Sequence, residues 1–209
     1  MAQPQPALKF TPQEYYERER LADYKSQYYA GEIFAMAGGS VRHSRIGTNL
    51  TTQLGLRLQN GACVPYNSDL RVAIQGTGLI TYPDASVFCG KMEFDPADKR
   101  KETVVNPTMV FEVISESTEA YDRGAKAGHY RRIPSLKAFV HISQSSPQVE
   151  HYERQSGGMW LISEATGLEG ILKLPALGIE LPLAELYAGV EFDDPPRLNV
   201  VREGWMDLA

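Results

Sequence analysis

Apolar residues recur at helical spacing in the first half of the chain. Residues 43–59 carry Ile46, Leu50, Leu54 and Leu58 four positions apart, which predicts an amphipathic helix with one apolar face. Residues 11–22 begin with Thr-Pro-Gln-Glu, a helix start with threonine as the N-cap and proline in the first turn. A third helix is predicted over residues 121–132, because its pattern ends just before a proline.

Short apolar and β-branched runs between these helices predict strands. Two pairs of runs are typical of hairpins: 24–29 with 32–37 around an Ala-Gly turn, and 148–154 with 159–163 around a Ser-Gly-Gly turn. The other predicted strands cover residues 63–66, 69–74, 109–114, 136–142, 170–174 and 178–181, and residues 79–89 carry a Tyr-Pro-Asp element followed by a short strand.

The order of these elements predicts an α/β fold. We expect a mixed central β-sheet flanked by helices, with an antiparallel β-meander toward the C-terminus. A length of 209 residues suits one domain spanning 1–209. Within it, a loose Gln/Pro-rich tail is expected at 1–8 and an extended tail at 193–209.

One predicted strand carries a carboxylate in the middle of an apolar run. Residues 109–114 are apolar except for Glu112, a composition typical of a strand covered on both faces. Burying a carboxylate there is costly unless a metal, a cation or hydrogen bonds compensate it. Asp84 follows a Tyr-Pro pair at the mouth of another strand, and Lys126 lies on the third helix. Two carboxylates on neighbouring strands with a lysine nearby indicate a divalent-cation site for an anionic substrate.

Composition and charge narrow the class of protein. Hydrophobic residues make up 43% and charged residues 22%, as in ordinary globular proteins. A net charge of −5 argues against a broad basic surface that binds nucleic acid non-specifically, so any contact with nucleic acid must be confined to a local patch. No apolar run approaches the roughly 20 residues that span a bilayer. The N-terminus lacks the pattern of a secretory signal. We therefore expect a cytoplasmic protein with no membrane partner.

The chain has two cysteines, Cys63 and Cys89. They do not form a Cys-x-x-Cys pair, so a zinc knuckle or a redox motif is not supported. They could pair with each other, but buried free thiols are the expectation for a cytosolic protein.

Six short motifs occur in a characteristic order. Together they resemble the PD-(D/E)xK nuclease superfamily, and within it a bacterial family described as putative restriction endonucleases, formerly a domain of unknown function. The similarity covers about residues 11–153. The motifs are Gly31-Glu32-Ile33, Arg42-His43-Ser44-Arg45-Ile46, Ser68-Asp69-Leu70-Arg71-Val72, Tyr82-Pro83-Asp84, Phe111-Glu112-Val113-Ile114-Ser115 and Tyr121-Asp122-Arg123-Gly124-Ala125-Lys126.

The resemblance implies a restriction-endonuclease-like fold and a metal-dependent endonuclease that hydrolyses phosphodiester bonds in DNA. By the superfamily pattern, Asp84 and Glu112 hold a catalytic Mg²⁺ or Mn²⁺ ion. The upstream acid of the family matches Glu32, which would complete the metal shell or hold the lysine. That lysine normally lies two residues after the strand acid, where this chain has Ile114, and Lys126 on the next helix is the match. Many nucleases of this fold act as homodimers, so a homodimer is also implied.

Each candidate also has a structural explanation. Lys126 could be a solvated charge paired with Asp122 one helical turn earlier, and Glu32 could be an ordinary hairpin residue. His43, in the first turn of its helix, could be a partly buried structural residue or could contact a substrate phosphate. Arg123 could likewise bind phosphate or belong to a solvated helix face.

Other classes of function stay open at this point. The chain could be a catalytically lapsed DNA-binding or structural module of the same fold, or a nuclease that acts on RNA. An enzyme should lose its activity on Glu112→Ala, whereas a binding module should keep its affinity for DNA in the presence of a chelator.

Overall fold

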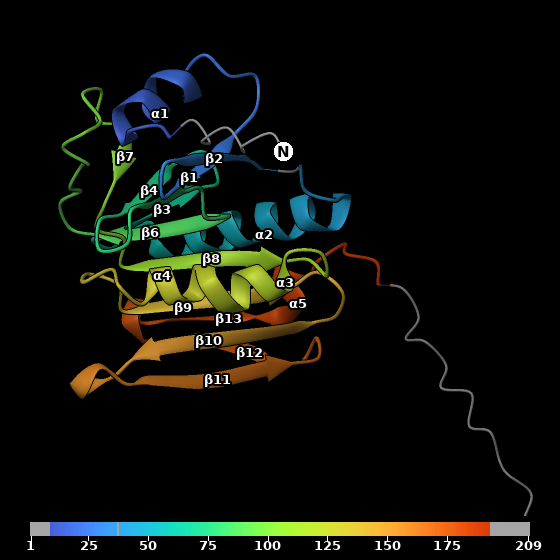
Figure 1. The fold of residues 1–209 in the computed structure, drawn as a ribbon. Coiled ribbons are helices and arrows are strands. Elements are labelled where there is room, and N and C mark those ends of the chain that lie inside the picture. The colour runs from blue at the N-terminus through green and yellow to red at the C-terminus, as the bar shows by residue number, and fades with distance from the viewer. Residues whose placement is uncertain (1–8, 37, 193–209) are drawn as a thin grey trace, which may run out of the picture.

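A six-stranded mixed sheet forms the centre of the fold in the computed structural model, which describes residues 9–36 and 38–192 (Figure 1). Its strand order is β11-β10-β9-β8-β6-β3; β8 and β9 are parallel and all other neighbours are antiparallel. The strands are β3 (Cys63–Asn67), β6 (Ala85–Cys89), β8 (Met109–Ile114), β9 (Ala138–Ser143), β10 (Gln148–Arg154) and β11 (Trp160–Thr166).

A second sheet of five strands has the order β2-β1-β5-β4-β7. Helix α1 (Pro12–Glu19) packs its buried tyrosines, Tyr15 and Tyr16, against this sheet. The helix has the predicted Thr11 N-cap, which is part of a capping box in which Thr11 and Glu14 each bond the other's backbone N–H. The strands are β1 (Ser26–Tyr29), β2 (Glu32–Ala35), β4 (Arg71–Ile74), β5 (Leu79–Thr81) and β7 (Thr103–Val104).

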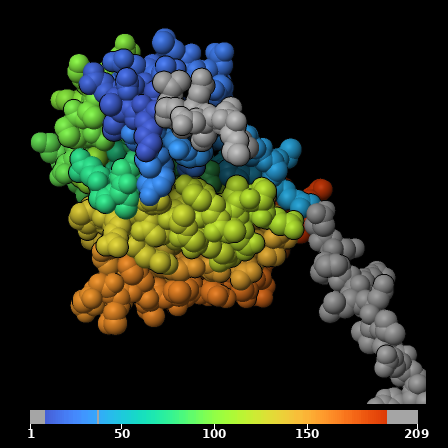
Figure 2. All heavy atoms as spheres, viewed as in Figure 1, coloured from blue at the N-terminus to red at the C-terminus, as the bar shows by residue number. Residues whose placement is uncertain are grey.

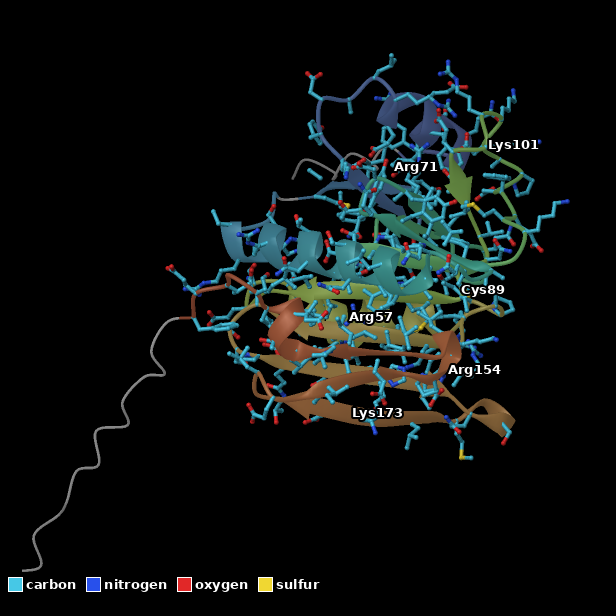
Figure 3. All side chains as sticks on the ribbon, turned by 180° about the vertical axis from the view of Figure 1, so that it is seen from behind. Arg57, Arg71, Cys89, Lys101, Arg154 and Lys173 are labelled. Atoms are coloured by element: carbon cyan, nitrogen blue, oxygen red, sulfur yellow. A yellow bond between two sulfur atoms is a disulfide. The ribbon has the colours of Figure 1, made fainter. Side chains whose placement is uncertain are left out.

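Helix α2 (Val41–Leu58) covers one face of the six-stranded sheet. Its predicted apolar stripe is buried among residues of β8 and β9. The two-stranded sheet of β12 (Ile171–Leu174) and β13 (Ile179–Pro182) and the short helix α5 (Leu183–Leu186) lie beside α2 on the same face (Figure 3). Arg57 joins them, donating to the backbone oxygen of Glu180 at 2.8 Å and pairing with Glu185 at 2.6 Å.

One continuous helical segment covers the opposite face of the six-stranded sheet. It consists of α3 (Glu119–Tyr121), a π-helical turn η1 (Asp122–Lys126) and α4 (Ala127–Tyr130). In Figure 2 this segment lies across the middle of the visible face as yellow-green spheres. Its buried residues Ala127 and Tyr130 pack on Val110 and Phe139 of the sheet. We refer to it as the covering segment.

The structure confirms the predicted α/β class, the helices and both hairpins. The antiparallel strands near the C-terminus are also confirmed. Two features differ from expectation: the strands divide between two larger sheets, and a π-helical turn interrupts the predicted helix 121–132. The tails predicted at 1–8 and 193–209 lie outside the described residues, and the single domain stays a prediction. Within the described part of the chain, no helix is long and apolar enough to cross a membrane.

The expectation of buried free thiols is wrong. Cys63 and Cys89 form a disulfide, and Cys89 is exposed. The two residues face each other in the antiparallel pairing of β3 with β6, and their Cα atoms are 4.0 Å apart. Their separation of 26 residues in the sequence gave no sign of this pairing.

Candidate active site

Asp84 lies where the chain passes from one sheet to the other. β5 ends at Thr81, and β6 begins directly after Asp84. Ala85 pairs with Phe111, so the next position along the two antiparallel strands brings Asp84 beside Glu112. The backbone N–H of Val113 donates to Asp84 Oδ2, with 2.7 Å between nitrogen and oxygen. This bond fixes the Asp84 carboxylate against β8.

Glu112 is buried in β8, on the face that the covering segment protects, and is only 5% exposed. The hydroxyl of Tyr130 donates to Glu112 Oε1, and Lys126 Nζ lies 2.8 Å from Glu112 Oε2. Burial raises the pKa of Glu112 to about 7; the Lys126 ammonium opposes this rise, and the Asp84 and Asp122 carboxylates add to it. A divalent cation beside this carboxyl would favour its ionised form.

Lys126 is also buried, and it comes from the π-helical turn. Its ammonium contacts two carboxylates, that of Glu112 and that of Asp122, whose Oδ1 is 3.4 Å away. Burial acts to lower the pKa of Lys126, but these two carboxylates outweigh burial and hold the pKa above its ordinary value. The lysine therefore stays charged beside Glu112.

His43 of α2 contacts the Asp84 carboxylate at the oxygen that does not accept from the Val113 N–H. It lies in the first turn of α2, where its backbone N–H donates to the N-cap hydroxyl of Ser40. His43 Nε2 is 3.2 Å from Asp84 Oδ1, and this bond raises the pKa of the imidazole. Gly39 leaves room for the ring, because a Cβ at that position would lie 2.5 Å from His43 Nδ1.

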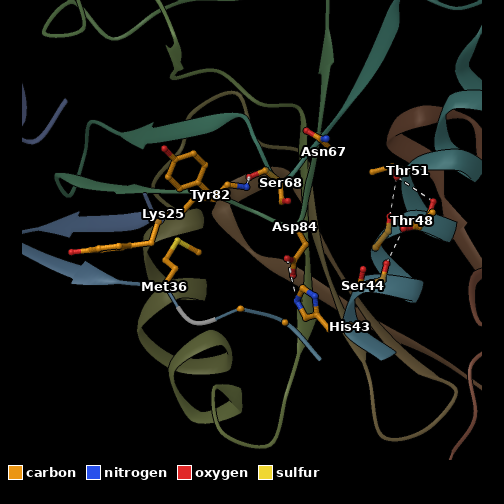
Figure 4. Close-up of a pocket in the computed structure, with 14 residues that line it drawn as sticks. Lys25, Met36, His43, Ser44, Thr48, Thr51, Asn67, Ser68, Tyr82 and Asp84 are labelled. Atoms are coloured by element: carbon orange, nitrogen blue, oxygen red, sulfur yellow. Dashed lines mark hydrogen bonds and ion pairs between the residues drawn. The ribbon is translucent and has the colours of Figure 1, made fainter. Parts of the chain in front are cut away.

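A pocket of about 620 Å³ opens beside Asp84 and His43 (Figure 4). Ser44, Thr48 and Thr51 of α2 form one wall. Residues 24–25, 67–68 and Tyr82, together with Met36, form the rest. Among the described residues that line the pocket, Asp84 is the only carboxylate, so the pocket opens directly at the candidate metal ligand.

Two predicted site residues lie apart from this cluster. Glu32 is exposed on β2, an edge strand of the five-stranded sheet. Within the part of the chain that the structure describes, no hydrogen bond or ion pair links it to Asp84, Glu112 or Lys126. Arg123 pairs with Glu119 at 2.8 Å and with Glu150, whose bond raises the pKa of the guanidinium. The roles of Glu32 in the metal shell and of Arg123 in phosphate binding stay predictions, without support from these contacts.

Tyr130 was not among the candidates named from the sequence, although its hydroxyl donates to Glu112. The available signal was spacing, because Asp122 and Tyr130 stand four residues either side of Lys126 and share its helix face. Burial, and then the Glu112 carboxylate, raises the pKa of Tyr130 well above its ordinary value. The phenol thus stays protonated and acts as a donor that orients Glu112.

Next to Glu112 in the sheet lies a buried histidine. His141 pairs with Glu112 across β8 and β9, and neither of its ring nitrogens has a hydrogen-bond partner among the described residues. Burial lowers the pKa of His141 to about 4, although the Glu150 carboxylate 3.9 Å away acts in the opposite direction. The imidazole is therefore neutral in the folded protein at neutral pH.

This neutral histidine predicts a loss of stability in acid. An unfolded histidine has a pKa near 6.5, so its stabilising contribution is fully present above that pH and is lost as the pH falls toward 4. The loss amounts to about 3 kcal/mol of unfolding free energy. In urea unfolding across this range, the stability of wild type should fall by this amount relative to that of His141→Leu as the pH falls. Parallel curves would show that His141 does not titrate in this way.

The donor set fits a magnesium ion that keeps water ligands. Among the described residues, no group of three or more His, Cys, Asp and Glu side chains could hold a metal by itself. Mg²⁺, however, is commonly bound through one or two carboxylates, with waters and substrate phosphates completing its octahedron. Asp84 and Glu112 supply two neighbouring carboxylates of this kind, and Asp84 faces the pocket from which a phosphate would approach.

Comparison with known proteins identifies relatives over most of the chain. A family model, Uma2, described as "Putative restriction endonuclease", matches residues 12–184. Two uncharacterized proteins of Synechocystis sp., slr1290 and sll1609, are 36% and 35% identical over 188 and 157 residues. These alignments cover 90% and 75% of this chain, and 96% and 88% of the relatives.

A solved structure shares the fold. It is a crystal structure from Anabaena variabilis, described as a putative nuclease belonging to DUF820. The TM-score is 0.63 at 16% sequence identity, and the match covers 79% of this chain and 91% of the other. At this identity the likeness concerns the arrangement of helices and strands.

Proposed function

The chain belongs to the Uma2 family, and on that premise we propose that it is a metal-dependent endonuclease that hydrolyses phosphodiester bonds in DNA. The observation that carries the proposal is the position of Asp84 beside Glu112, with Lys126 bonded to Glu112 and a pocket open at Asp84. The family description and the putative nuclease of similar fold both favour this class of reaction.

Asp84 and Glu112 would hold the Mg²⁺ or Mn²⁺ ion. When bound, such an ion polarises the phosphate and lowers the pKa of a coordinated water. Lys126 lies against Glu112, where its charge can stabilise the negative charge that develops on the phosphate oxygens. Tyr130 and the Val113 N–H hold the two carboxylates in place, since each donates to one of them. His43 positions Asp84 from the pocket side.

The position of the lysine departs from the superfamily pattern, and the structure offers a physical basis for the change. The usual lysine position is Ile114, whereas Lys126 reaches Glu112 from the covering segment. The π-helical turn contributes both Asp122 and Lys126 to the cluster. Such turns are often found at functional sites.

Metal binding and cleavage test the proposal together. We expect Mg²⁺ or Mn²⁺ to bind saturably to wild type in calorimetric titration and to bind much more weakly to Asp84→Ala. We also expect DNA cleavage that requires the ion and stops with chelator. Intact DNA across a broad panel, combined with DNA affinity that survives chelator, would favour the lapsed binding module instead. A homodimer and a cytoplasmic location stay predictions.

A further inference from the structure

The pocket beside Asp84 is larger than a metal site requires. Its volume of about 620 Å³ falls within the roughly 300–1,000 Å³ of typical small-ligand sites. A metal ion held by Asp84, with its waters and one phosphate, would fill only the end of the pocket formed by Asp84 and His43. The remaining space extends between α2 and the segments that contain Lys25, Asn67 and Tyr82 (Figure 4).

One wall of this space carries aromatic side chains. Tyr24 lines the pocket and is 63% exposed, although a tyrosine ring gains from being covered. Tyr82 lies nearby, with the Lys25 ammonium 5.3 Å from its ring centroid. Lys25 is held in place by Asp69 at 2.6 Å and by the backbone oxygen of Ser68 at 2.9 Å. The wall thus presents an open ring beside a fixed, already paired cation.

The opposite wall is polar and uncharged. Ser44, Thr48 and Thr51 project from one face of α2 into the pocket (Figure 4). The hydroxyls of Thr48 and Thr51 donate to backbone oxygens of α2, which leaves their lone pairs as acceptors. Among the described residues of the lining there is no arginine, and the one lysine, Lys25, is already paired with Asp69. A neutral, planar, polar group suits such walls better than a second phosphate does.

We propose that this pocket binds the base of an unpaired nucleotide adjoining the scissile phosphate. The preferred substrate is then single-stranded DNA or a locally unpaired segment, with the base stacked on Tyr24 and its polar edge toward α2. A base within a stacked duplex cannot enter such a pocket unless it is flipped out of the helix. This inference rests on the proposed function, since the phosphate at Asp84 places the base.

Binding and cleavage of two matched probes test the pocket. The probes are a fluorescein-labelled oligothymidylate and the same strand annealed to oligodeoxyadenylate, studied by anisotropy and by Mn²⁺-dependent cleavage. We expect tighter binding and faster cleavage of the single strand. Tyr24→Ala should weaken single-strand binding by about 5- to 150-fold, the loss of one base stack. The control Tyr29→Ala, at a partly exposed tyrosine that does not line the pocket, should bind like wild type.

A second pair of variants fills the pocket without altering its aromatic wall. Thr48→Trp places a bulky ring in the cavity, whereas Thr52→Trp adds the same ring on an exposed part of α2 outside it. Only Thr48→Trp should reduce single-strand binding.

The outcomes separate the pocket from the nuclease activity. In one outcome, wild type binds and cleaves single strand and duplex equally, with no change in Tyr24→Ala or Thr48→Trp. That result would refute the base-binding pocket but not the nuclease activity. Pocket-dependent binding of the single strand without any metal-dependent cleavage would keep the pocket and overturn the nuclease. Absence of both binding and cleavage would overturn both.

Discussion

Glu112→Gln is expected to lower the rate of metal-dependent DNA cleavage by about 10³-fold, while the chain stays folded. The substitution removes the charge that would hold the ion, and an ion contributes several kcal/mol to transition-state stabilisation, where 1.36 kcal/mol is tenfold in rate. Glutamine keeps an acceptor for the Tyr130 hydroxyl in the same space. Asp122 still neutralises Lys126. Single-turnover cleavage at saturating Mn²⁺, with circular dichroism to monitor folding, measures both effects.

Glu116→Gln is the matched control for this prediction. Glu116 lies four residues further along, in the exposed turn after β8, and loses the same charge on substitution. It should cleave like wild type. If Glu112→Gln also cleaved like wild type, Glu112 could not be a metal ligand, and the site would have to be built around Asp84 alone.

Local patterns in the sequence were sufficient to predict most helices and strands. The stripe from Ile46 to Leu58 gives α2, because its four apolar positions recur at helical spacing and all four are buried. Thr11 and Glu14 fix the start of α1 through their reciprocal bonds. Turn residues such as Ala30-Gly31 placed the hairpins, because their geometry depends on only a few residues.

Features that depend on distant contacts were not predicted. The division into two sheets arises at the Pro-Asp element, which separates β5 from β6. β1 and β4 pair with β5 in one sheet, whereas β3 pairs with β6 in the other. The disulfide follows from that same pairing of β3 with β6. The sequence predicted a lysine near Glu112, but not the π-helical turn that carries Lys126 and the Asp122 carboxylate paired with it.

The candidate site was predicted in part for similar reasons. Asp84 and Glu112 stood out because one follows a proline at a strand start and the other interrupts an apolar strand. Their proximity depends on the register of β6 against β8, which the sequence alone does not fix. Glu32 matched a motif and lies on an exposed edge strand, so its predicted role in the metal shell stays a prediction.

The register also aligns two acidic residues and a neutral histidine in a row across the six-stranded sheet. Glu112 pairs with His141, and His141 pairs with Glu150 on the next strand. The covering segment supplies a cation to each acid of this row, Lys126 to Glu112 and Arg123 to Glu150. A single helical segment thus neutralises carboxylates that would otherwise be costly to bury. The same segment therefore contributes to stability as well as to the proposed chemistry.

Lys126→Met is expected to lower the free energy of unfolding by about 3–5 kcal/mol, because it leaves two buried carboxylates side by side without a cation. Most of this loss should disappear when Glu112→Gln is present as well, since one of the two charges is then gone. The control Lys137→Met, at an exposed lysine, should change stability by no more than about 0.5 kcal/mol. Urea unfolding of the single and double variants gives the coupling energy between Lys126 and Glu112. Additive effects would show that the two side chains are not energetically linked. Strong coupling, together with loss of cleavage in a folded Lys126→Met variant, would show that the lysine both stabilises the fold and takes part in catalysis.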